Sequence, residues 1–130
     1  MKSSSLLKVG GVVLATLLSQ YAIAVEDEDV NLYDVQDLYN TCAVKPDAPE
    51  YVVTTFACRG FIGGAVQYHD AVSDRKHLKR LICYPKTATV EDGRDAFVAW
   101  GEKNLNNKER MGEAAVVGLV RALAEKYPCK

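Results

Sequence analysis

The stretch TTFACRGFIGGAVQYHD, from Thr54 to Asp70, decides the fold class. It is an apolar run that contains one cysteine, Cys58, and three glycines. At 100° per residue, one side of a helix here carries five apolar or small residues: Val52, Phe56, Gly60, Gly63 and Val66. A helix that is apolar over most of its surface is usually buried on several sides. The pattern therefore predicts the central helix of a small helical bundle.

The glycines of this stretch need a physical reason, because each glycine inside a helix costs about 1 kcal/mol relative to alanine. Gly60 and Gly63 lie one turn apart, so we expect them to let a neighbouring backbone come close. That neighbour is either in the core of the same chain or in a second copy of it. The alternative is that the pair Gly63-Gly64 ends the helix and begins a loop.

The first 24 residues are typical of a secretory signal peptide. Lys2 and Lys8 precede an apolar run over 9–18, and Ala22-Ile23-Ala24 is a small-x-small cleavage site. The run is too short for a comfortable membrane span. Cleavage after Ala24 leaves 25–130 as a single helical domain of slightly acidic charge. That charge argues against non-specific binding to nucleic acid.

Four cysteines lie in the mature chain: Cys42, Cys58, Cys83 and Cys129. An even number of cysteines in a small exported domain predicts two disulfides. Three pairings are possible. We favour Cys42 with Cys58 and Cys83 with Cys129, which join sequence neighbours and then tie down the C-terminal tail. A zinc site is the alternative, but there is no CxxC pair and neither histidine has ligand-like spacing to a cysteine. No metal or cofactor is expected.

The rest of the chain also reads as helical. A first helix is expected from about Leu32 to Ala43 with Asn31 as its cap, and Thr89 is expected to open another. The last helix is expected from about Arg110 to Tyr127. Turns fall at 45–50 and 101–107, and a short extra helix is possible near 72–81. The core stripe of the last helix is expected to be Val116, Leu119, Val120, Leu123 and Tyr127.

No segment alternates apolar and polar residues as a strand does. We therefore predict an all-α fold, a small disulfide-stapled bundle of four to five helices.

The densest positive patch follows the central helix and comprises Arg75, Lys76, His77, Lys79 and Arg80. It is either a solvated face or a surface that contacts a partner.

A catalytic interpretation finds few candidate groups. Ser73 is the only serine of the mature chain, and its closeness in sequence to His69 and Asp70 does not make a triad. The cysteines are better explained as disulfides than as nucleophiles. We expect His69 to cap or pack near a helix end. The sequence therefore predicts that the protein is not an enzyme.

Several short motifs, taken in order, resemble a known family. They are a signal peptide, LYNTC on the first helix, ACRGFIGG on the second, CYP before a threonine-capped helix, and a last amphipathic helix that ends in YPC. Together, over about 32–129, they resemble the Tai-type immunity proteins of bacterial type VI secretion. One departure is the turn after the third helix, where Asn104, Asn106 and Asn107 stand in place of a usual proline.

This resemblance implies a periplasmic, non-enzymatic helical protein that is commonly a homodimer. Its partner would be a peptidoglycan amidase effector of the cysteine–histidine type, which a protruding element blocks by entering the cleft. Two loops are candidates for that element, 71–80 and 101–110. The first is preferred, because its charge would steer it toward an acidic cleft.

The partner-binding residues expected on these two loops are Arg75, Lys76, His77, Lys79, Arg80, Lys103, Asn104 and Asn106. A different interpretation is a periplasmic accessory or chaperone-like binding protein built on the same stapled bundle. A hydrolase is the third.

Overall fold

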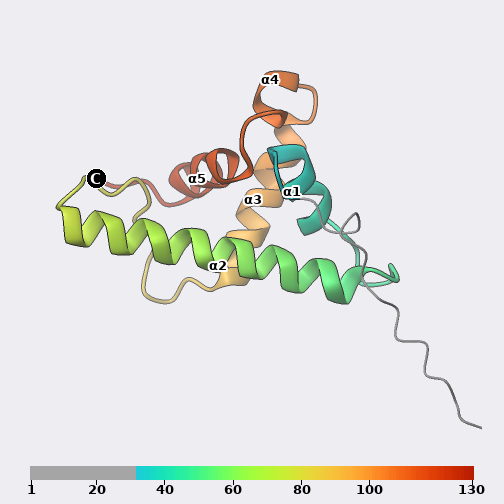
Figure 1. Ribbon diagram of the computed structural model, residues 1–130, viewed down its shortest axis with the longest axis horizontal. Coiled ribbons are helices and arrows are strands. Elements are labelled where there is room, and N and C mark those ends of the chain that lie inside the picture. Colours follow the sequence, from blue (N-terminus) through green and yellow to red (C-terminus); the bar gives the residue numbers. More distant parts are fainter. Residues whose placement is uncertain (1–31) are drawn as a thin grey trace, which may run out of the picture.

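The computed structural model describes residues 32–130. The predicted signal peptide and the predicted Asn31 cap lie outside these residues. Figure 1 shows the helices α1 (Val35–Cys42), α2 (Tyr51–Lys76), α3 (Val90–Asn104), α4 (Lys108–Met111) and α5 (Ala115–Lys126). The described part of the chain contains no strand, only one antiparallel bridge between Asp34 and Ala114. The predicted all-α, disulfide-stapled class is confirmed. No helix within 32–130 is both long and apolar enough to cross a membrane.

The centre of the bundle is formed by α1 and α3, not by α2. These two helices pack on each other, and α2 and α5 each pack more extensively on both of them than on one another. In Figure 1, α2 runs along one side of the molecule. Leu38 of α1 and Phe97 of α3 have no exposed surface at all. The prediction that the longest helix is the central one is therefore wrong.

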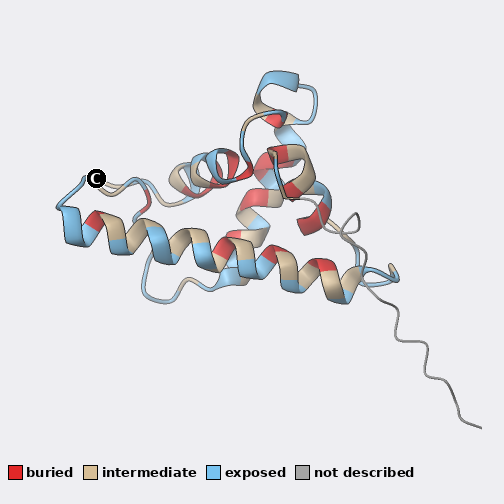
Figure 2. Ribbon diagram, viewed as in Figure 1, coloured by how far each residue is buried: buried red, intermediate tan, exposed pale blue. Residues whose placement is uncertain are grey.

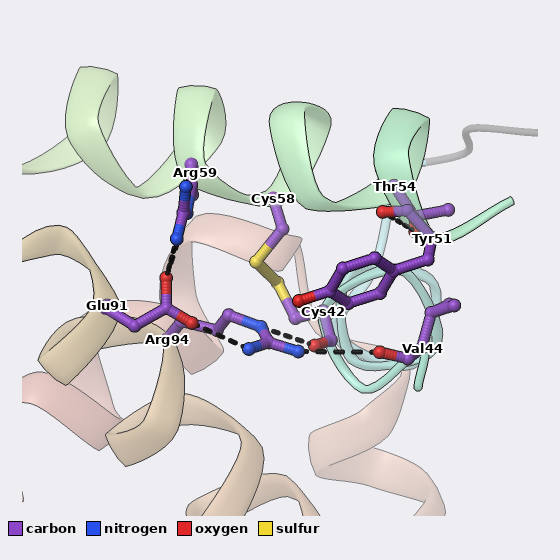
Figure 3. The surroundings of a disulfide bond; sticks show 8 residues. All are labelled: Cys42, Val44, Tyr51, Thr54, Cys58, Arg59, Glu91 and Arg94. Atoms are coloured by element: carbon purple, nitrogen blue, oxygen red, sulfur yellow. Dashed lines mark hydrogen bonds and ion pairs between the residues drawn. A yellow bond between two sulfur atoms is a disulfide. The ribbon is translucent and has the colours of Figure 1, made fainter. Parts of the chain in front are cut away.

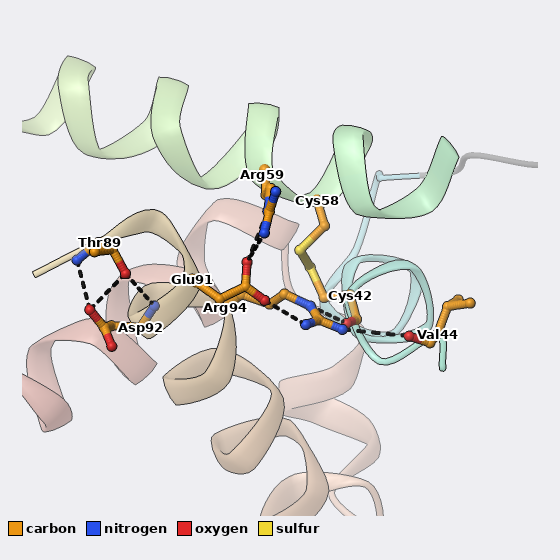
Figure 4. Close-up of polar contacts among 8 residues, drawn as sticks. All are labelled: Cys42, Val44, Cys58, Arg59, Thr89, Glu91, Asp92 and Arg94. Carbon is orange, nitrogen blue, oxygen red and sulfur yellow. Dashed lines mark hydrogen bonds and ion pairs between the residues drawn. A yellow bond between two sulfur atoms is a disulfide. The ribbon is translucent and has the colours of Figure 1, made fainter. Parts of the chain in front are cut away.

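Two helices begin with reciprocal caps. The Asp34 side chain accepts a hydrogen bond from the Asp37 backbone N–H at 2.8 Å, and the Asp37 carboxylate accepts one from the Asp34 backbone N–H at 3.4 Å. Helix α1 therefore begins at Val35 and not at Leu32. At the predicted cap of α3, the Asp92 backbone N–H donates to Thr89 Oγ1 at 3.2 Å (Figure 4). The Asp92 carboxylate accepts the Thr89 backbone N–H at 2.8 Å.

Helix α2 continues through its glycine pair for 26 residues and ends at Lys76. Neither Gly63 nor Gly64 has a positive φ, so the backbone stays helical there. The alternative in which this pair ends the helix is therefore wrong, as is the short extra helix near 72–81. The helix ends where His77 adopts the left-handed conformation, with φ 51°.

The face of α2 that is buried differs from the predicted one. Thr54, Cys58, Ile62 and Ser73 are the buried residues, whereas Phe56 is 71% exposed. Figure 2 shows most of the α2 surface as intermediate or exposed. Cys58 lies about 160° round the helix from Phe56, at 100° per residue. The disulfide to Cys42 therefore turns the Cys58 side inward and the Phe56 side outward.

The glycines of α2 do not bring another backbone of the same chain close. A Cβ atom built on Gly60, Gly63 or Gly64 meets no atom within 4 Å outside the helix's own backbone. The expected role of Gly60 and Gly63 in packing within the chain is therefore contradicted. The close contacts lie elsewhere: Gly118 of α5 sits against Val35 of α1.

The last predicted helix is interrupted near Gly112, so α4 and α5 are separate elements. Its inward face is also shifted. The buried residues of α5 are Ala115, Gly118, Leu119, Ala122 and Leu123. Val116 is 44% exposed, because the small residues Gly118 and Ala122 face the core and allow close packing.

Two disulfides join the pairs that the sequence analysis favoured. Cys42 and Cys58 link α1 to α2 with a Cα–Cα distance of 5.2 Å. Cys83 and Cys129 link the loop after α2 to the C-terminal tail with a Cα–Cα distance of 5.0 Å. The Cys83 backbone N–H also donates to the Tyr127 carbonyl at 2.9 Å, so this loop and the tail are held together twice.

We predict that Gly60→Ala and Gly64→Ala each raise the free energy of unfolding by about 0.5–1 kcal/mol, because alanine is the better helix former and its Cβ enters open space. Gly118→Ala is the matched control. It should lower the free energy of unfolding by about 1–3 kcal/mol, because its Cβ would overlap Val35. Urea unfolding of the monomeric protein measures all three. A loss of stability at Gly60 or Gly64 comparable to that at Gly118 would contradict the open face.

Candidate partner-binding site

The predicted basic residues gather at the end of α2 and in the loop that follows it. Arg75, Lys76, His77 and Lys79 are exposed there. Positive charge at this position is favourable, because the C-terminal end of a helix carries partial negative charge. Four of the five residues are thus exposed at or just after the C-terminal end of α2.

The fifth, Arg80, is engaged within the chain. Its guanidinium lies 2.9 Å from the Asp74 carboxylate and 3.2 Å from that of Asp70. The hydrogen bond to Asp74, followed by the negative charge of Asp70, raises the pKa of Arg80 above its usual value. Arg80 therefore fastens the loop to α2, and its charge is largely neutralised by two carboxylates.

Asp70 is the hub of this fastening. It accepts hydrogen bonds from Arg80, from the hydroxyl of Tyr84 and from His69 Nδ1, the last at 2.9 Å. His69 Nε2 accepts the Leu81 backbone N–H at 3.1 Å, so the ring proton is on Nδ1 and is donated to Asp70. Side chains on α2 thus hold the following loop at three points, Arg80, Leu81 and Tyr84.

The titration of Asp70 reflects these contacts. Burial raises the pKa of Asp70, but the hydrogen bonds from Tyr84 and His69 and the positive charge of Arg80 together bring it below its usual value. The same hydrogen bond to Asp70 raises the pKa of Tyr84. The charged form of Asp70 therefore stabilises the loop.

At and just before these anchors the loop presents apolar side chains that the sequence analysis missed. Leu78 is 55% exposed and Leu81 is 57% exposed, with Lys79 between them. The signal available was the sequence Leu78-Lys79-Arg80-Leu81 itself, in which two leucines interrupt a charged run. The loop therefore offers both positive charge and apolar surface to a partner.

Most of the second predicted loop is helical, because α3 continues to Asn104 and α4 begins at Lys108, so the predicted turn at 101–107 is confined to 105–107. Lys103 and Asn106 are exposed. Asn104 turns inward, donating to the Trp100 carbonyl at 2.7 Å and accepting from Arg110 at 2.8 Å. Asn107 caps α4 by accepting the Arg110 backbone N–H at 3.1 Å. Two of the asparagines in this turn therefore shape it.

A groove between α2 and the start of α3 was not predicted. It contains a cavity of about 190 Å³, and Ile62, Gly63 and Val66 of α2 form one wall of it. It shares Thr89 and Val90 with a shallower hollow, which is also lined by Phe56, Arg59, Gly60 and Glu91. Gly60 and Gly63 thus both line open surface depressions. The sequence offered one indication of these depressions, because glycines that destabilise a helix need a reason to be there.

Glu91 connects the two walls of this groove. Figures 3 and 4 show it between Arg59 of α2 and Arg94 of α3. Its carboxylate accepts from Arg59 Nε at 2.8 Å and from Arg94 Nη1 at 2.7 Å. Hydrogen bonds from Arg59 and then Arg94 lower the pKa of Glu91. Arg94 also donates to the Cys42 carbonyl at 2.9 Å, so the groove wall is tied to the disulfide.

The groups that a catalytic interpretation would use have other roles. All four cysteines are in disulfides. Ser73 is buried on α2 and only 7% exposed, while His69 and Asp70 hold the loop. Within 32–130 no group of three potential ligands is placed to hold a metal ion. The surfaces described so far, a fastened loop and an apolar groove, define a stapled helical protein of the binding class.

The chain matches the family model of Rap1a immunity proteins over residues 34–129, and it belongs to that family. It is therefore an immunity protein that binds a cognate secreted effector, and it is not an enzyme. The immunity class expected from the sequence is confirmed. The disulfides and the family both fit an exported protein. Neither a curated protein nor a solved structure matches the chain.

We predict that Asp70→Asn weakens the attachment of the loop to α2. The pKa of Asp70 is lowered in the folded state, so its stabilising effect is present above the unfolded pKa of about 3.9 and disappears as the pH falls through the folded value. The wild type should therefore lose stability more steeply below about pH 4 than the variant does. At neutral pH the Leu81 amide should exchange faster in the variant.

Urea unfolding across this pH range and hydrogen exchange measure both effects. Asp74→Asn is the control, because Asp74 is 67% exposed and contacts Arg80 alone among these groups. Equal acid slopes in the wild type and Asp70→Asn would contradict the assignment of Asp70 as the hub.

Proposed function

We propose that this protein is a periplasmic immunity protein that binds a peptidoglycan amidase effector delivered by type VI secretion and blocks its active site. Family membership supports the immunity function, and the Tai-type resemblance supports the amidase as its target. In this proposal residues 1–24 are a signal peptide, and 25–130 form the exported domain. Two disulfides suit the oxidising periplasm.

The single observation that carries the mechanism is the fastened loop after α2. Arg80, Leu81 and Tyr84 hold it to the helix, so little conformational entropy is left to lose on binding. Lys79 stands between the exposed Leu78 and Leu81. A rigid element with this surface is suited to enter a cleft and exclude substrate. The positive charge of Arg75, Lys76 and Lys79 would speed its encounter with an acidic rim.

Loop 101–110 is the less favoured candidate for the blocking element. Two of its predicted contact residues, Lys103 and Asn106, are exposed, but the third, Asn104, is bound to Arg110 within the chain. His77 marks the start of the favoured loop and is exposed beside Arg75 and Lys76. We further propose that the protein acts as a homodimer, as the family resemblance implies.

The amidase can be identified by capture on the mature chain from periplasmic extract, followed by mass spectrometry. With the purified pair, we predict that Arg75→Glu/Lys79→Glu raises the dissociation constant at least about tenfold by removing electrostatic attraction. Lys45→Glu/Lys126→Glu makes the same change of charge on exposed residues outside both candidate loops, and it should leave affinity nearly unchanged. Calorimetry measures both.

Release of peptides from peptidoglycan tests occlusion directly. The mature chain should abolish release at a ratio of one immunity protein to one amidase. A captured amidase that stays fully active in the complex would refute occlusion. Loss of affinity only in the Lys45/Lys126 variant would exclude the basic loop.

A further inference from the structure

An exposed apolar ridge runs along the outer side of α2. Its members are four residues apart and comprise Val52, Phe56, Gly60, Gly64 and Tyr68. The three large ones are 63%, 71% and 72% exposed, respectively. Residues at this spacing form the ridges with which helices pack against one another. No other helix or loop within 32–130 covers the ridge on α2.

The ridge is lowest at its centre, where glycines replace side chains. Added Cβ atoms at Gly60 and Gly64 would meet nothing within 4 Å, and neither residue has a positive φ. The glycines therefore serve neither the backbone conformation nor packing within the chain, although they weaken the helix. They leave open space on the outer side of α2, where Gly60 and Phe56 line a hollow, and such space lets a second helix approach closely.

We propose that this ridge is the dimer interface, and that it docks on the same ridge of a second copy with the two α2 helices antiparallel. The glycine turns of the two copies would lie against each other at the crossing point. The inference rests on the homodimer proposed above. It does not depend on the identity of the effector or on which loop blocks it.

The pattern of residue sizes favours a second copy as the occupant. Along the ridge, Phe56, Gly60, Gly64 and Tyr68 run large, small, small, large, and this order reads the same in both directions. In an antiparallel pair, Phe56 of each copy lies beside Tyr68 of the partner subunit, and the two glycine dips coincide. Ridges of this spacing interlock at a crossing angle of about −50°.

The charges at the ends of α2 favour the antiparallel orientation. Asp47 and Glu50 precede the helix, whereas Arg75 and Lys76 lie in its last turn. An antiparallel pair places the acidic end of each copy on the same side as the basic end of the other, beyond the contact between the ridges, so Arg75 and Lys76 stay free to meet an effector; it also opposes the helix dipoles. A parallel pair would place like charges together.

The length of the ridge indicates how tightly the proposed dimer should associate. From Val52 to Tyr68 it spans about 24 Å at 1.5 Å per residue. One helix pair of this length lies at the small end of specific interfaces, near about 1,200 Å² in total. We therefore expect a dimer that dissociates in the micromolar range.

Sedimentation velocity of the mature chain over a series of concentrations tests the proposal. The wild type should pass from monomer to dimer. Gly60→Gln/Gly64→Gln should raise the dissociation constant at least about tenfold, because side chains in the dip prevent close approach. Ala99→Gln, at an exposed position on α3, is the matched control and should dimerise like the wild type. Circular dichroism should show that all three are folded.

Cross-linking tests the orientation. A short bis-maleimide should join Phe56→Cys to Tyr68→Cys in an equimolar mixture, and it should join neither variant efficiently to itself. Self-cross-linking of each variant alone would overturn the antiparallel arrangement.

Failure of this inference is distinguishable from failure of the wider proposal. A wild type that stays monomeric into the hundreds of micromolar would overturn both the homodimer and the ridge. A glutamine variant that dimerises normally would leave the homodimer standing but exclude the ridge. If that variant dimerises normally yet no longer binds the captured amidase, the ridge belongs to the effector and the inference is overturned.

Discussion

The bond between Cys42 and Cys58 sets the rotation of the longest helix, and the other surfaces follow from that rotation. It fixes the Cys58 side of α2 against α1. Arg94 reinforces the same junction by donating to the Cys42 carbonyl and to Glu91, which in turn accepts from Arg59. One covalent link and one chain of charged hydrogen bonds thus hold α1, α2 and α3 in a single arrangement.

That arrangement leaves much of α2 outside the core. Beyond Ile62 its only buried residue is Ser73, and the loop that returns from its end is held by polar contacts centred on Asp70. Hydrogen bonds and ion pairs near the surface are weaker than apolar burial, but several of them together fix one loop geometry. A fixed geometry of this kind suits an immunity protein, because recognition of its cognate effector depends on shape and contact.

The glycines of α2 lower the stability of the helix and leave open space on its outer side. Alanine in their place would strengthen the helix without a clash. Gly118 of α5 is the opposite case, because the core leaves no room for a side chain there. Glycine in α5 is thus required by packing within the chain, whereas packing within the chain does not require the glycines of α2.

The sequence by itself determined the helical class, the Thr89 cap, the presence of two disulfides and the basic segment near Arg75, and it favoured the observed disulfide pairing without excluding the other two. Each depends on local spacing, residue chemistry or chain connectivity. Only the tertiary structure decided which face of α2 is buried. A helix that is apolar over most of its surface, with glycine at Gly60 and Gly63, can be buried on either side, and the choice depends on where Cys42 lies. The sequence likewise did not predict that Arg80 and Asn104 form hydrogen bonds within the chain, because their partners become neighbours only after the chain folds.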